Sequence, residues 1–388
     1  MRIDPQAATQ AYIDSLGPQA LELARSYTLG NHWLILAGLA VSALVTLIIV
    51  RSRILETLHA ALARRGPNLR ALLLGAATAA LSGIISLPFD LYSGWWRELQ
   101  YGRTSQALGD YLSQSALVFV LSTITLAVFF TGVYLLLRRT GKSWWIWAGG
   151  LVAGAISFLL LLSPVLIEPL FNEYRAIPDG EVRDAILVMA AEADIPETRI
   201  FVFDGSRQSN NFTANVSGIG SSARIAISDV ALADASLDEV KAVTGHEIGH
   251  YVLGHVWRSI VVLSLVAVAV FFLVGRTYAF FARLFGTAAP IDDPRGLPVF
   301  LFVFGLFFTL SAPVTNTLSR VGETEADDYS LRTVNLPDGL ASALIKTAEY
   351  RYPLAGPVEE AIFYTHPTVS NRVRRAMEWK TANPPEPQ

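Results

Sequence analysis

The sequence predicts a mainly α-helical membrane protein of about six spans that carries a small soluble α+β unit. Of its 388 residues, 52% are hydrophobic and 16% are charged, a composition too apolar for a soluble protein of this size. From about residue 168 the composition becomes that of a soluble domain. The candidate spans are six long apolar windows: 33–50, 71–89, 116–137, 144–167, 259–274 and 297–314.

Charge and cysteine content exclude several classes of function. The net charge is −3 and no basic patch is interleaved with aromatic residues, so we expect no nucleic-acid partner. The absence of cysteine excludes disulfides, thiolate metal ligands and a cysteine nucleophile. Residues 1–30 lack an apolar core of signal-peptide length, so window 33–50 would act as an uncleaved anchor. Few lysines and much alanine indicate a GC-rich bacterial genome, and we expect a multi-pass protein of the bacterial inner membrane.

Apolar and soluble stretches alternate and divide the chain into six parts. Residues 1–30 would form a surface tail or an interfacial helix. The other parts are a membrane domain of four spans, an α+β part, two further spans, a helical soluble part and a disordered tail: 31–167, 168–258, 259–314, 315–380 and 381–388.

The α+β part combines a helical pattern with two strand patterns. A helix is predicted over 179–194, and strands over 199–203 and 223–228, with a polar, glycine-containing excursion between the strands. The second strand comes directly before the next predicted helix. We expect this strand to form an edge at which an extended peptide could pair through its backbone.

The motif HEIGH lies on that next helix. Residues four apart lie one turn above each other, so His246 and His250 present two imidazoles to one point, with Glu247 beside them. This spacing is typical of a zinc site with an attached general base. Ser236 is a suitable N-cap, and we expect the helix to continue unbroken into window 259–274.

A catalytic zinc site needs a third protein ligand, whose identity the spacing leaves open. His255 follows His246 by nine residues and, at about 100° per residue, would project from the opposite side of the helix, which favours a structural or supporting role. The segment SRVGETEADDYSLR offers a carboxylate instead. Glu323 could bind zinc while Asp327, one turn later, accepts the ring N–H of a ligating histidine. A solvated acidic helix face would show the same pattern.

The segment FYTHPTVSNRVRRA supplies two further candidates, His366 and Arg372. Near zinc, a histidine and an arginine could stabilise the oxyanion of a tetrahedral intermediate. A capping or loop role fits these residues equally well. Their distance from HEIGH along the chain leaves the choice open.

Seven motifs between about residues 87 and 378 occur in the order found in one protein family: LPFDLYSGWWRELQYG, EPLFNEYRAIPDGEVR, FVFDGSRQS, ARIAISDVAL, DEVKAVTGHEIGHYVLGH, SRVGETEAD and THPTVSNRV. The chain therefore resembles the type 1 CAAX prenyl endopeptidases, which are integral-membrane zinc metalloproteases with an HExxH helix and a downstream ExxxD glutamate. The resemblance implies a gluzincin-type fold.

The resemblance also implies a role for each candidate residue. One Zn²⁺ per chain would be bound by His246, His250 and Glu323, with Asp327 supporting the site. His366 and Arg372 would border the scissile peptide bond.

The expected activity is zinc-dependent hydrolysis of peptide bonds, with Glu247 as general base. Expected partners are the lipid bilayer and peptide or protein substrates, including lipid-modified and membrane proteins. The resemblance implies trimming of the C-terminal residues of prenylated proteins. Two alternatives stay open: a quality-control protease of the heat-shock type, and a non-catalytic membrane scaffold, which should have lost Glu247 or the third ligand.

Two arguments about orientation disagree. Loops 51–70, 138–144 and 276–296 carry 5, 3 and 3 Lys/Arg, whereas the short segments on the other side, 1–30 and 90–115, carry two each. The positive-inside rule would place the catalytic side outside the cytoplasm. The family resemblance implies the cytosolic side, and this is the side we expect.

Overall fold

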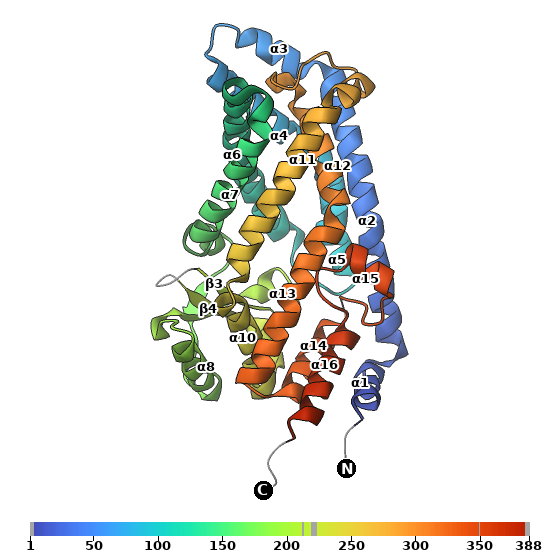
Figure 1. Cartoon of the computed structure of the whole chain (residues 1–388), viewed down its shortest axis with the longest axis vertical. Helices are drawn as coiled ribbons and strands as arrows, with labels where there is room; N and C mark the ends of the chain where they lie inside the picture. The colour runs from blue at the N-terminus through green and yellow to red at the C-terminus, as the bar shows by residue number, and fades with distance from the viewer. Residues whose placement is uncertain (1–3, 212, 219–222, 349, 385–388) are drawn as a thin grey trace.

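The computed structural model describes residues 4–211, 213–218, 223–348 and 350–384. A bundle of long helices lies above a sheet-bearing part in Figure 1. The bundle consists of α2 (Gly17–Ser52), α3 (Ile54–Ala61), α4 (Pro67–Leu91), α5 (Arg97–Gln100), α6 (Leu108–Thr140), α7 (Trp144–Leu162), α11 (His255–Phe285) and α12 (Leu297–Leu310).

The sheet-bearing part contains both ends of the described chain. Its helices are α1 (Pro5–Asp14), α8 (Glu181–Glu192), α9 (Asp229–Asp234), α10 (Leu237–Val252), α13 (Ala312–Thr333), α14 (Pro337–Thr347), α15 (Pro357–Phe363) and α16 (Val369–Ala382). Its strands are β1 (Tyr174–Ala176), β2 (Ile200–Phe203), β3 (Ala214–Ser217) and β4 (Arg224–Ser228).

In the described chain, four helical stretches are long and apolar enough to cross a membrane, or up to five if a pair bent by 52° counts as one. The stretch Leu108–Leu160 contains α6 and most of α7, and these two helices pack against each other. The packing is close, since a Cβ added at Gly132 would lie 3.0 Å from the side chain of Leu151. The bent pair joins Pro294–Leu310 to α13. Five of the six predicted apolar windows fall on these stretches, whereas window 144–167 extends beyond the end of α7 at Leu162.

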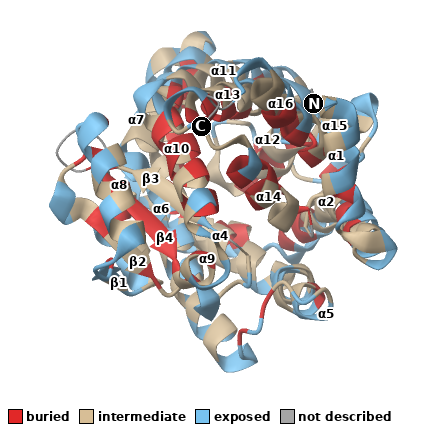
Figure 2. Cartoon of the chain, turned by 90° about the horizontal axis from the view of Figure 1, so that it is seen from below, coloured by how far each residue is buried: buried red, intermediate tan, exposed pale blue. Residues whose placement is uncertain are grey.

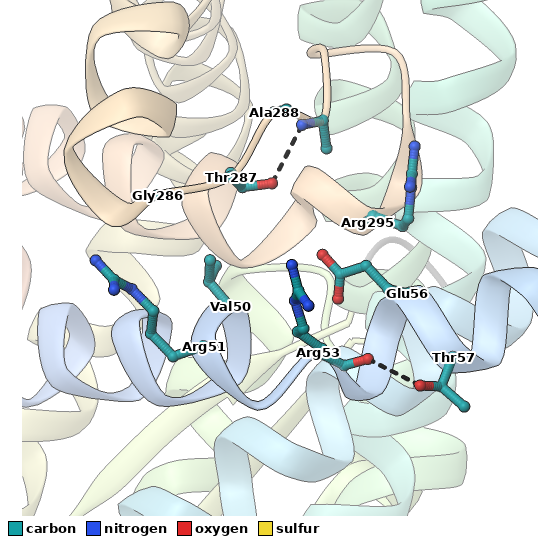
Figure 3. Close-up of a pocket in the computed structure, with 10 residues that line it drawn as sticks. Val50, Arg51, Arg53, Glu56, Thr57, Gly286, Thr287, Ala288 and Arg295 are labelled. Atoms are coloured by element: carbon teal, nitrogen blue, oxygen red, sulfur yellow. Dashed lines mark hydrogen bonds between the residues drawn. The ribbon is translucent and has the colours of Figure 1, made fainter.

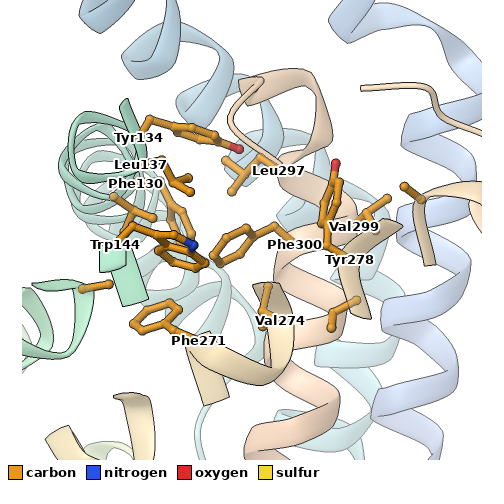
Figure 4. Packing of buried hydrophobic residues seen from close by; sticks show 14 of the residues in the cluster. Phe130, Tyr134, Leu137, Trp144, Phe271, Val274, Tyr278, Leu297, Val299 and Phe300 are labelled. Atoms are coloured by element: carbon orange, nitrogen blue, oxygen red, sulfur yellow. The ribbon is translucent and has the colours of Figure 1, made fainter. Parts of the chain in front are cut away.

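Aromatic side chains form the core of the bundle (Figure 4). The ring of Phe300 on α12 lies 5.4 Å from that of Phe130 on α6 and 5.8 Å from that of Trp144 on α7. Trp144 also contacts Phe271 on α11, with ring centroids 5.6 Å apart. These edge-on and tilted pairs fix four helices around one centre.

The first 30 residues connect the two parts. Helix α1 packs against α16, and the Tyr12 hydroxyl donates to Asp338 at 3.0 Å. Helix α2 has 36 residues and a length of about 54 Å, so it runs from the sheet-bearing part through the bundle. Buried Arg97 donates to Asn31 and to the carbonyl of Tyr27, which ties the helix after α4 to α2.

The four strands form one sheet in the order β1-β2-β4-β3. Strands β2 and β4 are parallel, and the two outer strands are antiparallel to their neighbours. The prediction that strand 223–228 forms an edge is wrong: β4 is central and buried at every residue (Figure 2). The two edges are β1 and β3, and β3 lies in the predicted excursion and packs against α10.

The prediction of one continuous helix from HEIGH into a membrane span is also wrong. Helix α10 ends at Val252, and Gly254 adopts a left-handed conformation with φ of 67° before α11 begins at His255. Glycine adopts this conformation without steric cost, so the chain changes direction there.

Candidate active site

A capping box begins the helix that carries HEIGH. The hydroxyl of Ser236 accepts from the Glu239 amide, and the Glu239 carboxylate accepts from the Ser236 amide at 2.7 Å. Glu239 also accepts from Lys346 at 2.8 Å and Ser342 at 2.6 Å, both on α14. Burial raises the pKa of Glu239, but these hydrogen bonds outweigh it and hold the pKa below its usual value. The start of α10 is therefore fixed against α14.

Two glycines allow α10 to lie close to α13. A Cβ at Gly249 would lie 3.2 Å from Ala326 Cα and 3.1 Å from Tyr329 Cβ. A Cβ at Gly245 would lie 2.6 Å from a methyl group of Val334. Larger residues at these positions would push the helices apart. The close approach brings HEIGH beside Glu323.

Three side chains from α10 and α13 converge on one point. The Nε2 atoms of His246 and His250 are 3.1 Å apart. Glu323 Oε2 lies 3.3 Å from His246 Nε2, and Glu323 Oε1 lies 3.4 Å from His250 Nε2. If one ligand atom is taken from each of the three residues, these atoms all lie within 4.8 Å of one another.

This donor set fits a divalent metal ion. Two imidazole nitrogens and a carboxylate oxygen are ligands typical of catalytic zinc. Glu323 Oε2 is buried and accepts no hydrogen bond within the described part of the chain. Burial alone would lower the pKa of His246, but Asp327 and Glu323 outweigh it and raise the pKa to about 9. The site therefore attracts positive charge, which a metal ion would supply.

Asp327 lies between His246 and Arg372. Its Oδ1 is 2.9 Å from His246 Nδ1, and both carboxylate oxygens accept hydrogen bonds of 2.7 Å from Arg372. Arg372 Nη1 also lies 3.4 Å from Glu323 Oε2. The two parallel hydrogen bonds fix the carboxylate that accepts the His246 Nδ1–H, which leaves Nε2 free to bind a metal.

The prediction that His255 faces away from the site is wrong. At Gly254 the chain changes direction and brings His255 back towards α10, so that His255 Nδ1 lies 2.8 Å from His250 Nδ1. His255 Nε2 lies 2.9 Å from Glu325, which also pairs with Arg258 at 2.7 Å. His255 thus contacts a candidate ligand without being one of the three converging groups.

The candidate catalytic glutamate borders a cavity of about 340 Å³. Burial raises the pKa of Glu247, and the adjacent His246 and His250 partly offset this. His366 lines the same cavity, with Nε2 at 3.2 Å from Glu323 Oε1. The structure therefore brings all seven candidate site residues together: His246, Glu247, His250, Glu323, Asp327, His366 and Arg372.

Sequence reasoning missed other residues of this cavity. Arg351 lines it from the connection between α14 and α15, and Thr213 and Ala214 line it from the start of β3. No motif contains Arg351, so no pattern singles it out. Strand β3 alternates apolar and polar residues, with Ala214 and Val216 packed on the core, but it is only four residues long, which explains why it was not predicted.

A larger cavity of about 850 Å³ lies at the other end of the bundle (Figure 3). It is lined by Arg51 and Arg53 at the end of α2, by Gly286 and Thr287 after α11, and by Arg295. Arg295 pairs with Asp293 at 2.5 Å. Because no candidate ligand lines this cavity, it is not part of the candidate active site.

Two family models match most of the chain. The model of peptidase family M48 matches residues 176–380. A model described as CAAX prenyl protease N-terminal, five membrane helices, matches residues 5–173. The boundary between the two matches lies where the bundle passes into the sheet-bearing part.

Several individual proteins are similar to the chain. An uncharacterized metalloprotease, YhfN of Bacillus subtilis, is 29% identical over 79% of this chain and 73% of its own length. The human CAAX prenyl protease 1 homolog is 27% identical over 78% of this chain and 72% of its own. The Saccharomyces cerevisiae CAAX prenyl protease 1 is 27% identical over 76% and 69%.

A solved structure shares the fold. The crystal structure of S. mikatae Ste24p matches with a TM-score of 0.67 and 22% identity, covering 78% of this chain and 76% of the other. The arrangement of a membrane-helix bundle over a sheet-bearing part is therefore common to both chains.

Proposed function

Because the chain belongs to peptidase family M48 and carries several membrane helices, it is a multi-pass membrane metalloendopeptidase, and we propose that its metal is zinc, bound by His246, His250 and Glu323. One observation carries this proposal. Ligand atoms of these three residues lie within 4.8 Å of one another, and two of them, His246 and Glu323, line the same cavity as Glu247.

We propose Glu247 as the general base. Bound zinc would lower the pKa of water and polarise the scissile carbonyl. Glu247 would take a proton from the attacking water on its carboxylate and deliver it to the leaving amine. Support comes from its position on the cavity and from burial, which raises the pKa of Glu247 towards the range in which a carboxylate both accepts and returns a proton.

His366 and Arg372 would act on the other side of the reacting group. His366 borders the cavity, where its ring could donate to the oxyanion of the tetrahedral intermediate. Arg372 would act through Asp327, because its two hydrogen bonds hold the carboxylate that orients His246. The third guanidinium nitrogen of Arg372, Nη1, lies 3.4 Å from Glu323 Oε2.

We propose that the substrates are C-terminal segments of prenylated or otherwise lipid-modified proteins. The relatives named CAAX prenyl proteases support this class. A second, mainly apolar cavity of about 650 Å³ between α4 and α6 extends to Phe171 and Gln208 of the sheet-bearing part, which would suit a lipid chain. The edge strand β3 would pair with the peptide backbone.

We propose that the protein lies in a bacterial inner membrane with the active site on the cytoplasmic side. For the chain we retain the proposed division into 1–30, 31–167, 168–258, 259–314, 315–380 and 381–388. The two soluble parts, 168–258 and 315–380, would together form the catalytic unit, because the former supplies both histidines and the latter supplies Glu323.

The proposal is tested by metal analysis combined with peptide cleavage. Wild type should bind one zinc and cleave a prenylated peptide ending in a CAAX sequence. Glu247→Gln should bind zinc equally but lose about 10²-fold or more in kcat, because a general base of this kind contributes roughly 10²–10⁴-fold. Glu323→Ala should bind less zinc. Full turnover by Glu247→Gln would refute the assignment, and preferential digestion of a denatured membrane protein would favour the quality-control alternative.

A further inference from the structure

We propose that Arg351 binds the terminal carboxylate of the substrate, so that the enzyme cuts a short distance from a free C-terminus. This proposal rests on the proposed function and adds a carboxylate-binding subsite to it. Arg351 lines the same cavity of about 340 Å³ as Glu247, His366 and Arg372.

The two arginines of the cavity differ in their partners. Arg372 is bound through two hydrogen bonds to Asp327. Arg351 lies over the ring of Tyr350, at 5.4 Å from the centroid; among the described residues no carboxylate forms an ion pair with it, and Glu323 acts on it only through its more distant charge. Burial lowers the pKa of the Arg351 guanidinium, which nevertheless stays charged. A partly buried guanidinium without an acidic partner costs folding free energy unless a ligand neutralises it.

The shape and lining of the cavity define what such a ligand would be. About 340 Å³ is near the lower limit of roughly 300–1,000 Å³ for small-molecule sites, so there is room for a few residues and not for a long chain. Leu340, Ala343 and Leu344 of α14 give the same cavity an apolar part of its lining. The fitting occupant is a short peptide with apolar side chains that ends in a carboxylate. A guanidinium binds a carboxylate through two parallel hydrogen bonds.

Arg351 would therefore fix the distance between the cleaved bond and the C-terminus of the substrate. Glu247 and the candidate ligands mark where the peptide bond is cut, and Arg351 marks where the chain must end. Substrates whose chain continues past the cavity would lose the charged contact. The subsite therefore separates an enzyme that trims C-termini from one that cuts at internal positions.

Two matched peptides test this in the zinc-loaded full-length protein. They share one sequence that wild type cleaves, and one ends in a free carboxylate while the other ends in a carboxamide. Wild type should prefer the carboxylate peptide by about 10-fold or more in kcat/KM, as expected for a charged hydrogen-bonded pair. Arg351→Gln should bring this ratio close to one, mainly through KM, and Arg351→Lys should restore part of it. Arg332→Gln removes an exposed arginine of α13 outside the cavity and should keep the wild-type ratio.

The outcomes separate this inference from the proposed function. Equal cleavage of both peptides by wild type, an unchanged ratio in Arg351→Gln, or an equal loss on both peptides would overturn the role of Arg351 while leaving zinc-dependent proteolysis in place. Zinc-independent cleavage, or cleavage by Glu247→Gln at the wild-type rate, would instead refute the proposed function.

Discussion

The ring of His255 sets the tautomer of His250. When His250 binds a metal through Nε2, its Nδ1 carries the proton, so His255 Nδ1 at 2.8 Å must accept it. His255 then carries its own proton on Nε2, at 2.9 Å from Glu325. Arg258 holds the same carboxylate. The second proposed metal ligand, His250, would therefore be oriented by a neutral histidine, whereas the first, His246, would be oriented by Asp327.

Replacing His255 with alanine should weaken metal binding by about 10–100-fold, since loss of an outer-shell partner frees the ligand ring. His255→Asn should recover part of the affinity, because its amide oxygen can accept the His250 proton. Competition with a chelator measures the dissociation constant without relying on activity. His59→Ala, at the other end of the bundle, is the matched control and should bind metal as wild type does. Equal affinity of His255→Ala and wild type would contradict the role.

Single residues of the site differed in how well the sequence predicted them. The pairing of His246 with His250 is a local helical property, so spacing alone suggested it. Glu323 lies 73 residues beyond His250, and only the family resemblance favoured it over other acids of its segment. His255 was misplaced because the prediction assumed constant helical rotation. Arg351 stands in no motif, and its position depends on the packing of α14 and α15.

At the scale of elements, the metal site depends on the distance between α10 and α13. Gly249 provides that distance, since its Cα faces Ala326 and Tyr329. Each of the two helices is adjacent in sequence to a membrane helix. Helix α10 precedes α11 across the Gly254 turn, and α13 follows α12 with a bend of 52°. Side-chain volume at one position thus sets the separation of two ligand-bearing helices.

Replacing Gly249 with alanine should lower both stability and metal affinity. Alanine favours a helix by roughly 0.5–1 kcal/mol over glycine, but overpacking typically costs about 1–3 kcal/mol, so the clash with Ala326 should dominate. The shift would move His250 away from Glu323. Gly154→Ala on α7 is the control, because its added methyl group meets nothing within 4 Å. Thermal unfolding and zinc titration of both variants check this, and wild-type zinc affinity in Gly249→Ala would count against it.

The elements themselves were predicted unevenly. Long apolar helices give a strong signal, and each of the six windows lies mainly on a helix of the bundle, although 144–167 runs past α7 and 297–314 ends in α13. The break between α10 and α11 was missed because one glycine in an apolar stretch is compatible with a helix as well as with its end. The edge strand β3 was missed because four residues carry too little pattern, and the role of the edge was therefore given to β4.

At the scale of the whole molecule, the active site and the arginine-rich loops lie at opposite ends. The turn after α3 and the end of α11 form one end of the bundle, and α10, α14 and α16 lie at the other (Figure 1). The positive-inside tendency favours cytoplasmic arginines, whereas the proposed orientation makes the active site cytoplasmic. The two orientations differ in how the chain lies in the bilayer and not in its internal packing, so the same fold is compatible with either orientation.

Labelling with a membrane-impermeant maleimide decides the orientation, since the chain has no cysteine of its own. Arg64→Cys lies in the exposed turn after α3, and Arg374→Cys lies on the exposed face of α16. In intact bacterial cells, the proposed orientation predicts labelling at position 64 and none at position 374 until the cells are permeabilised. The reverse pattern would place the active site outside the cytoplasm.

The order of the site residues along the chain has a consequence for biosynthesis. During translation both histidines and Glu247 emerge before α11, whereas Glu323 emerges only after α12 and Arg372 later still. A nascent chain would therefore hold two proposed ligands and the proposed base without Glu323 or the arginine that holds Asp327. Hydrolytic competence would arrive only after the last membrane helix has been inserted, which would keep an immature chain from cutting neighbouring nascent proteins.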